Sequence, residues 1–566
     1  MNKLKAFLLF LVLNFGISYS ALAQVLPPST DASVLSTRVS EEAERKVTSI
    51  AKEIDIEEKE RKTAAPSGKD KKFFVKEIQL DGNKLLTKKK LNPIIAPYEG
   101  RDILLSEAKE LAKEIEKAYR DEGYIMTYAY LPPQKIKDQK LKIAVLEGKT
   151  GKVIIEGNKW FSKKNLMRYS QMKEGKPLKY EVLAKSVQRM NDNPDRDVKA
   201  ILQPGDETGE TDIYLKVKDR FPLHVGGSFD NQGTESTGRR RFGANFRHNN
   251  FIFPDALLLS GAFLGKDFGS VYGQYLIPIT PFGTKLALGF SHSRISPKKE
   301  FKIFDIDGRS QNYTATISQP IVERERFSIN SHLGFELKES VTHNVAGTSR
   351  RDRLRVLRPG FDIRLDDRLG STVLSNEVSF GIDGFGATSV NNPLSSKRGA
   401  PPNFVSLTGS LYRSLRLPFN TFGTARFDYQ LSLDKLTPQE EQYLGGLNTI
   451  RGYPEGDFLA DQGFTLRLEY FVPPFFVPDN WQIPYMNKPL KEQFQLLFFS
   501  DLGYGRLRGV RDGQTRSRYL HGIGAGVRIF LIKNLSARIE LAHAIGNEPL
   551  TESNHTRVHF SLNADI

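Results

Sequence analysis

From residue 221 to the end of the chain, apolar and polar residues alternate with a period of two. In one such run, Phe327, Ile329 and Phe335 alternate with residues such as Ser328 and Asn330. Successive side chains of a β-strand point to opposite faces of the sheet, so the pattern predicts strands with one apolar and one polar face. We place sixteen strands, at residues 221–230, 239–248, 255–265, 269–278, 283–293, 311–319, 326–338, 352–365, 374–384, 403–413, 423–433, 462–472, 493–504, 519–531, 534–545 and 556–566.

Two architectures fit sixteen alternating strands. A soluble protein would need two or three β-sandwiches joined by turn-rich linkers. A transmembrane barrel has an even number of antiparallel strands, an apolar outer face, a polar lumen, and short turns at one end. We favour an all-β membrane barrel over residues 221–566. Sixteen strands enclose more space than side chains fill, so the lumen should hold water unless something plugs it. Polar residues expected to face this lumen are Arg426, Asp428, Arg467, Glu469, Arg528 and Glu540.

The first 23 residues have the features of a secretory signal peptide. Lys3 and Lys5 precede the apolar run Ala6–Leu13, and the segment closes on the small-residue site Ala21-Leu22-Ala23. This arrangement predicts cleavage before Gln24 and export of the mature chain. An uncleaved membrane anchor is the alternative, although the apolar run is short for one.

Composition restricts the chemistry further. The 566 residues carry a formal net charge of +16 and contain no cysteine, which excludes thiolate nucleophiles, disulfides and cysteine-based metal sites. Excess basic residues suit either nucleic acid or anionic lipid head groups. For an exported chain we expect the lipid and no nucleic acid.

Motifs for catalysis or cofactor binding do not emerge from the sequence. Gly148-Lys149-Thr150 is similar to the end of a phosphate loop, but Ile143 stands where the first glycine belongs. The sequence contains no HExxH pair and no GxSxG nucleophile elbow. We therefore expect no enzyme, no metal and no cofactor, with an outer-membrane protease or lipase as the alternative.

Within the N-terminal segment 24–62, the pattern of residues 37–62 predicts an amphipathic α-helix. Val47, Ile50 and Ile54 lie on one apolar stripe, and the opposite face is dense in Glu and Lys. The linker 63–72, with the sequence TAAPSGKDKK, is rich in Pro, Gly and charge and should be mobile. The helix is either solvated and undocked, or it docks elsewhere in the protein and can leave.

An internal repeat separates this segment from the barrel. Ile78–Leu91 aligns with Val153–Leu166 at a constant offset, each with a β-rich run, a Gly-Asn turn and a helix start. A second helix and two strands follow in each copy; in the first copy Ser106 is the expected N-cap of that helix. We therefore expect two α+β domains of order β-α-α-β-β, over residues 73–148 and 150–218.

Several short motifs lie on these elements in a fixed order: Asn191-Asp192-Asn193-Pro194, Asp230-Asn231-Gln232-Gly233, Ile450-Arg451-Gly452-Tyr453 and Phe499-Ser500-Asp501-Leu502-Gly503. Together they resemble the motifs of the two-partner secretion transporters, the exporters of filamentous haemagglutinins and haemolysins. The resemblance covers residues 38–566.

This resemblance implies an outer-membrane transporter with two periplasmic POTRA domains and a plug helix ahead of the barrel. The POTRA domains would receive an unfolded exoprotein, a large adhesin or haemolysin-like protein, by strand addition to a sheet edge that the sequence leaves open. Outer-membrane lipid, lipopolysaccharide and the barrel-assembly machinery would be further partners. A barrel-inserting assembly factor is the alternative, but such factors usually carry more POTRA domains; a passive porin would need none.

The resemblance also implies that the loop 434–461 folds into the barrel. Ordering a loop costs roughly 1–2 kcal/mol per residue, so something must hold it there. Arg451 in the loop and Asp501 on the thirteenth strand can form a bidentate ion pair, and we predict that this pair latches the loop. Gly452 and Tyr453 complete the loop motif, and Phe499 and Gly503 complete the strand motif. The alternative is an exposed arginine and an aspartate with other partners.

Two features depart from the family pattern. The sequence ends in Ile566, where the family usually has a terminal aromatic residue that the barrel-assembly machinery reads. The connection 473–492, rich in proline, is long for a periplasmic turn. Either a strand boundary is misplaced there, or the connection is an insertion.

Overall fold

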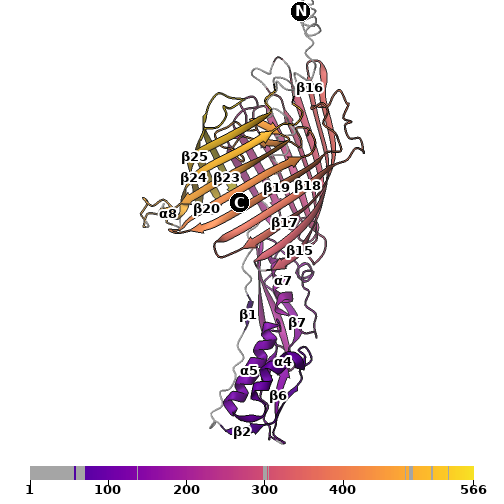
Figure 1. The fold of residues 1–566 in the computed structure, drawn as a ribbon, viewed down its shortest axis with the longest axis vertical. Helices are drawn as coiled ribbons and strands as arrows, with labels where there is room; N and C mark the ends of the chain where they lie inside the picture. Colours follow the sequence, from indigo (N-terminus) through magenta and orange to yellow (C-terminus); the bar gives the residue numbers. More distant parts are fainter. Residues whose placement is uncertain are drawn as a thin grey trace, which may run out of the picture. The chain divides into compact units, whose positions relative to one another are not determined.

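The computed structural model describes residues 56–58 and 71–565, except residues 137, 298–302, 304, 325, 479, 483–488, 511–513 and 533. The described chain separates into a unit that ends at Pro222 and a barrel unit that begins at Leu223 (Figure 1). The signal peptide 1–23 and most of the predicted linker lie outside the described residues, as do Val47, Ile50 and Ile54.

The first repeat copy forms a three-stranded sheet covered by two helices. The sheet order is β3-β6-β5, and β2 and β4 form a separate two-stranded ribbon. Leu91, Leu111, Ile115 and Ile143 belong to its buried core. Its elements are β2 (Lys72–Val75), β3 (Glu77–Asp81), α4 (Lys88–Ile95), the 3-10 helix η2 (Ala96–Tyr98), β4 (Arg101–Leu104), α5 (Leu105–Asp121), β5 (Tyr128–Tyr130) and β6 (Lys140–Leu146).

The expected N-cap of α5 is wrong. The helix begins at Leu105, which places Ser106 inside its first turn. The Glu107 carboxylate accepts the Leu104 backbone N–H at 2.6 Å and fills the role of the cap from within the helix.

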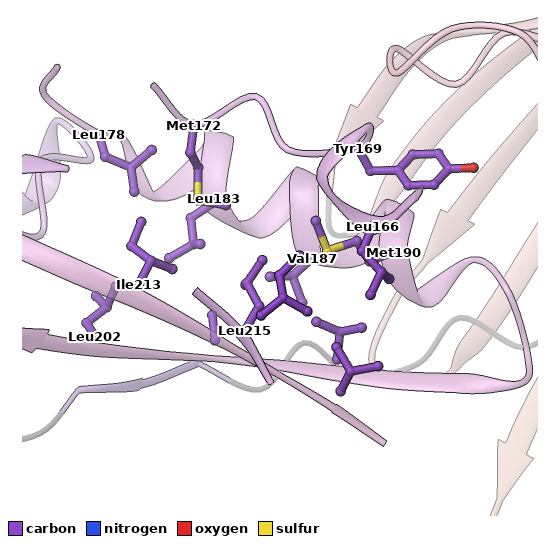
Figure 2. Packing of buried hydrophobic residues seen from close by; sticks show 14 of the residues in the cluster. Leu166, Tyr169, Met172, Leu178, Leu183, Val187, Met190, Leu202, Ile213 and Leu215 are labelled. Atoms are coloured by element: carbon purple, nitrogen blue, oxygen red, sulfur yellow. The ribbon is translucent and has the colours of Figure 1, made fainter. Parts of the chain in front are cut away.

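The second copy has the predicted order β-α-α-β-β, whereas the first copy adds β2, η2 and β4, with β4 between its two helices. In the second copy, too, two helices pack on a sheet. Figure 2 shows Leu183, Val187 and Met190 of α7 facing Ile213 and Leu215 of β9, all in one buried cluster. The elements are β7 (Lys149–Glu156), α6 (Lys163–Met167), α7 (Tyr180–Asn191), β8 (Arg196–Pro204) and β9 (Glu210–Asp219).

The Gly-Asn turn is built in the same way in both copies. Asn83 and Asn158 each donate a side-chain hydrogen bond to the carbonyl three residues on, at 3.4 and 2.8 Å. Gly82 and Gly157 precede them with φ of +91° and +85°, a left-handed conformation that favours glycine. The repeat read from the sequence is therefore a structural repeat.

A carboxylate near the end of each copy closes this turn. Glu147 accepts the backbone N–H groups of residues 84 and 85 and the hydroxyl of Tyr119. Asp219 accepts the N–H groups of residues 159–161 in the second copy. Burial raises the pKa of Tyr119, and its bond to Glu147 adds to that shift.

The helix predicted over residues 37–62 is wrong at its C-terminal end. Ile56–Glu58 form strand β1, which pairs in parallel with β8 so that Ile56 lies opposite Ala200. Without β1, strand β8 would be the edge of its sheet, with unpaired backbone groups that attract an extended segment. Pairing with this edge overrides the local helical pattern. The rest of the predicted helix lies outside the described residues.

Sixteen antiparallel strands close into a barrel, with β27 paired to β10. Each strand predicted from the alternation corresponds to one barrel strand. The strands are β10 (Leu223–Asp230), β11 (Arg241–His248), β12 (Leu257–Leu264), β13 (Phe268–Pro278), β14 (Lys285–Ile295), β15 (Asp307–Arg324), β16 (Phe327–Asn344), β17 (Gly347–Asp366), β18 (Gly370–Gly381), β19 (Val405–Leu417), β20 (Thr421–Ser432), β23 (Gln462–Val472), β24 (Phe494–Arg506), β25 (Ser517–Ile532), β26 (Leu535–Ala544) and β27 (Thr556–Asp565).

The lengths of three strands differ from the prediction, and the connection after β23 decides between two alternatives that the sequence left open. Strands β15, β16 and β17 are 18, 18 and 20 residues long and extend beyond their predicted ends. At their extracellular ends most residues are polar on both faces, so the alternation stops before the strand does. The strand boundaries on either side of the connection 473–492 are as predicted to within one residue, since β23 ends at Val472 and β24 begins at Phe494. The connection contains the short helix α8 (Leu490–Gln493), which leads directly into β24. In the described part of the chain, no helix is long and apolar enough to cross a bilayer.

Candidate functional site

The loop 434–461 between β20 and β23 is a folded hairpin whose residues are largely buried. Two short strands, β21 (Gln442–Leu444) and β22 (Phe458–Ala460), pair antiparallel at its stem. At its tip, the Gly446 N–H donates to the Ile450 carbonyl at 3.0 Å. Its partners lie on the polar faces of the barrel strands, so the loop lies within the lumen.

Arg451 at the tip of this loop is fully buried and meets Asp501 of β24, which is fully buried as well. Arg451 Nε and Nη2 donate to the two carboxylate oxygens of Asp501 at 2.6 and 2.7 Å. The Arg451 backbone N–H adds a third bond to Asp501 at 3.1 Å. This is the bidentate geometry in which an arginine–carboxylate pair is strongest.

Two further carboxylates complete the surroundings of Arg451. Its Nη1 donates to Glu469 of β23 at 2.8 Å and to Glu540 of β26 at 3.1 Å. Removing one partner of a buried ion pair typically costs about 3–5 kcal/mol, because it leaves an uncompensated charge. The tip is therefore fixed to three barrel strands by one side chain. The neighbouring cations that contact the same carboxylates are Arg467, Arg528 and Arg538.

The other motif residues contact the same tip. The Phe499 ring lies under the Arg451 guanidinium, with 3.5 Å between the ring centroid and Cζ. The Tyr453 hydroxyl accepts the backbone N–H groups of His521 and Gly546 at 3.4 and 3.1 Å. The Phe499 ring makes a cation–π contact with the guanidinium. The Tyr453 hydrogen bonds attach the tip to β25 and to the loop after β26.

Glycines of loop and wall make this close fit possible. Gly452 has φ of +93°, a left-handed conformation that reverses the chain at the tip. A Cβ on Gly503 would lie 2.3 Å from Ile450 Cδ1, and one on Gly522 would lie 1.8 Å from the Arg451 carbonyl oxygen. Side chains at either wall position would displace the loop.

A second set of ion pairs holds the base of the loop. The Glu440 carboxylate accepts Arg358 Nη2 of β17 at 2.9 and 2.8 Å and Lys338 Nζ of β16 at 2.9 Å. Glu336 lies 3.0 Å from Arg358 and 3.2 Å from Lys338 on their other side. Three strands separate β17 from β23, so base and tip are anchored to different parts of the wall.

The loop's two arms are joined near β23 as well. Lys397, from the connection after β18, donates to Asp461 at 2.7 Å and also pairs with Glu441. Asp461 is fully buried and accepts the Leu436 backbone N–H at 2.6 Å. This contact fixes the start of the loop next to its end.

The structure brings together all six predicted motif residues of loop and strand: Arg451, Asp501, Gly452, Tyr453, Phe499 and Gly503. Sequence reasoning placed Glu469 and Glu540 in the lumen but did not assign them to Arg451. It missed the base anchor of Glu440, Lys338 and Arg358. Charges at inward-facing positions are the signal that could have found it. Among the described residues, no group of three His, Asp or Glu is arranged to hold a metal.

Comparisons with protein families give two matches. The family model described as haemolysin secretion/activation protein ShlB/FhaC/HecB matches residues 209–529, more than half of the chain. The model of a ShlB-type POTRA domain matches residues 73–148.

Individual relatives are similar over most of the chain. The heme/hemopexin transporter protein HuxB of Haemophilus influenzae (strain 86-028NP) is 24% identical over 498 residues, 84% of either protein. The outer membrane transporter CdiB of Dickeya dadantii is 22% identical over 470 residues, covering 81% of this chain and 80% of CdiB.

Solved structures share the fold. CdiB from Escherichia coli superposes with a TM-score of 0.72 at 18% identity, covering 97% of this chain and 98% of that one. BamA from Haemophilus ducreyi lacking POTRA domains 1–3 gives a TM-score of 0.51 at 14% identity, covering 87% of this chain and 100% of that shortened chain. At these identities the superpositions establish fold alone.

Proposed function

This chain belongs to the haemolysin secretion/activation protein family, and from that premise we propose that the latched loop 434–461 is a fixed part of its secretion path. The protein is an outer-membrane transporter of two-partner secretion. Its POTRA domains lie in the periplasm and receive an unfolded exoprotein, which the barrel secretes to the cell surface.

The observation that carries the proposal is the complete burial of Arg451 among three carboxylates. A loose loop of this length would move through the lumen and collide with a chain in transit. An anchored loop leaves one defined path beside it. The ion pairs at Arg451 therefore serve transport by keeping the loop against the wall.

Arg451→Ala tests the latch. We expect a barrel that still folds, judged by heat-modifiable migration in gels, and an impaired rate of exoprotein secretion. Arg451→Lys should give an intermediate rate, because an ammonium group keeps the charge but cannot form the bidentate pair.

Arg413→Ala is the matched control, since Arg413 bonds to Thr372 and Asp367 on the barrel wall and not to the loop. It should secrete at the parental rate. Normal secretion by Arg451→Ala would contradict the latch.

The partner exoprotein is part of the same proposal. We propose a large adhesin or haemolysin-like protein as cargo, in line with a family named for haemolysin secretion. The relatives named above include a heme/hemopexin transporter, so cargo differs between members of this fold. Lipopolysaccharide, outer-membrane lipid and the barrel-assembly machinery are the remaining proposed partners, as expected for a barrel placed in that membrane.

A further inference from the structure

Outward side chains of β14 to β17 form cross-strand rows that change character toward the extracellular ends of the strands. The row nearest the membrane centre here is apolar: Leu288, Ala315, Phe335 and Leu357. The next row is Phe290, Tyr313, Leu337 and Arg355. Above it come His292, Gln311, Glu339 and Arg353, and then Arg294, Arg309, Val341 and Arg351.

These rows face away from the lumen. Lys338 and Arg358 point inward, because both contact Glu440 of the inward loop. Their sequence neighbours Leu337 and Leu357 therefore lie on the outer face. Outward apolar side chains of these rows are accessible, as expected for lipid-facing positions: Leu288, Phe290, Tyr313 and Leu337.

The apolar part of β17 matches the thickness of a membrane. Every outward position from Leu357 to Leu365 on this strand is apolar. About 9–11 residues of a tilted strand cross a bilayer, so Arg355 lies at the hydrocarbon boundary and Arg351 and Arg353 lie beyond it. The chain enters the barrel from the periplasm, so the turns after the first, third, fifth and seventh barrel strands are extracellular. β16 is the seventh barrel strand, so the turn at 345–346 that follows it is extracellular. The arginines therefore face the outer leaflet.

Positive charge at this boundary exceeds negative charge. Five arginines, Arg294, Arg309, Arg351, Arg353 and Arg355, form what we call the arginine rim, against two outward carboxylates. Asp307 bridges Arg294 and Arg309 at 2.8 and 2.9 Å, and Glu339 lies 3.0 Å from Arg353 and 3.7 Å from Arg351. Like charges set close together on a sheet repel, so this surplus favours an anionic ligand.

The surplus does not recur on the strands β20 and β23 to β25. Strands β20 and β23 to β25 carry an aromatic row at the corresponding end, namely Tyr429, Phe464, Tyr504 and Tyr519. The row above it, Gln462, Arg506 and Ser517, holds a single cation. Both groups of strands carry outward aromatic residues at this level, but only β14 to β17 carry the arginine rim above them.

We propose that the arginine rim binds the phosphate groups of a phosphorylated glycolipid of the outer leaflet, the lipid A part of lipopolysaccharide. The inference rests on the outer-membrane location of the transporter. Guanidinium groups bind phosphate oxygens bidentately, and alternate residues of a strand lie about 7 Å apart, so the three β17 arginines reach separate oxygens. The apolar rows beneath give the acyl chains a surface to contact.

The test measures lipid A binding by the full-length protein in phosphatidylcholine nanodiscs and compares the parent with two variants. The rim variant is R351Q/R353Q/R355Q. The control variant R324Q/R368Q/R416Q removes the same charge from exposed arginines at the periplasmic ends of strands. We expect the rim variant to bind diphosphorylated lipid A about tenfold or more weakly, the factor given by one lost charge-assisted hydrogen bond. The control should bind as the parent does.

Equal binding by parent and rim variant would overturn the inference, and so would equal weakening in the control, which would indicate net charge alone. Competition by inorganic phosphate alone would also overturn it, by showing that the site takes a free anion. If the triple variant does not fold, the single variant Arg353→Gln replaces it. Arg451→Ala should bind lipid A normally, so failure here and failure of the loop latch are distinguishable.

Discussion

Gly522 of β25 is a wall position at which the tip of the inward loop brings its backbone into close contact. A Cβ there would lie 1.8 Å from the Arg451 carbonyl oxygen and 3.0 Å from its carbonyl carbon. A backbone atom cannot rotate away as a side chain can, so the loop itself would have to move. The sequence does not distinguish Gly522 from Gly524 and Gly526 beside it.

Gly522→Ala should therefore displace the tip without unfolding the barrel. Because the chain has no cysteine, Leu447→Cys provides a clean reporter of tip exposure; Leu447 is 1% exposed in the latched loop. We expect faster maleimide labelling of L447C and slower secretion in the G522A background. Gly269→Ala is the control, since a Cβ on Gly269 meets its nearest neighbour at 3.8 Å. Unchanged labelling in G522A would show that the loop tolerates the added methyl group.

At the scale of elements, the sequence predicted the barrel strands well because one face meets lipid and the other water. Alternation follows from that difference alone, so it marked all sixteen strands. It failed at the extracellular ends of β15 to β17, where both faces are polar and the pattern stops. It failed again at β1, because pairing with β8 depends on a free sheet edge far along the chain.

The candidate site, like the fold, could be predicted in part. Arg451 and Asp501 lie in recognisable motifs, so their contact could be expected. The base anchor could not, since Glu440 meets Lys338 and Arg358 about a hundred and about eighty residues away, with no local pattern to join them. The β21–β22 stem is too short to stand out from the loop around it.

Glu440→Gln tests whether base and tip are separate anchors. The change keeps the shape of the side chain but leaves Lys338 and Arg358 without one counter-charge, a loss of about 3–5 kcal/mol for a buried pair. A reporter cysteine at Thr437→Cys, near the base, should label faster, while L447C at the tip should not change. With Arg451→Ala we expect the reverse: L447C at the tip should label faster, while T437C at the base should not change. Equal acceleration of both reporters by either change would show that the loop moves as one body; Asp428→Asn is the control on the wall.

On the scale of the whole molecule, the barrel alone does not determine function. The same architecture superposes on a CdiB transporter with a TM-score of 0.72 and on BamA with 0.51. What assigns this chain to the secretion family is the family model that matches residues 209–529, across most of the barrel. A transporter and an assembly factor handle different substrates: one exoprotein in the first case, many barrels in the second.

A deletion strain separates these two outcomes. Because a two-partner transporter serves a dedicated partner, we expect one large protein to disappear from the culture supernatant and cell surface, and to accumulate or be degraded in the periplasm. The measurement is the proteome of both fractions beside the parent strain, with complementation by the intact chain and by Arg451→Ala. Complementation by the intact chain should restore export, and Arg451→Ala should restore it only in part. Intact export together with depletion of many outer-membrane barrels would instead assign the protein to barrel assembly.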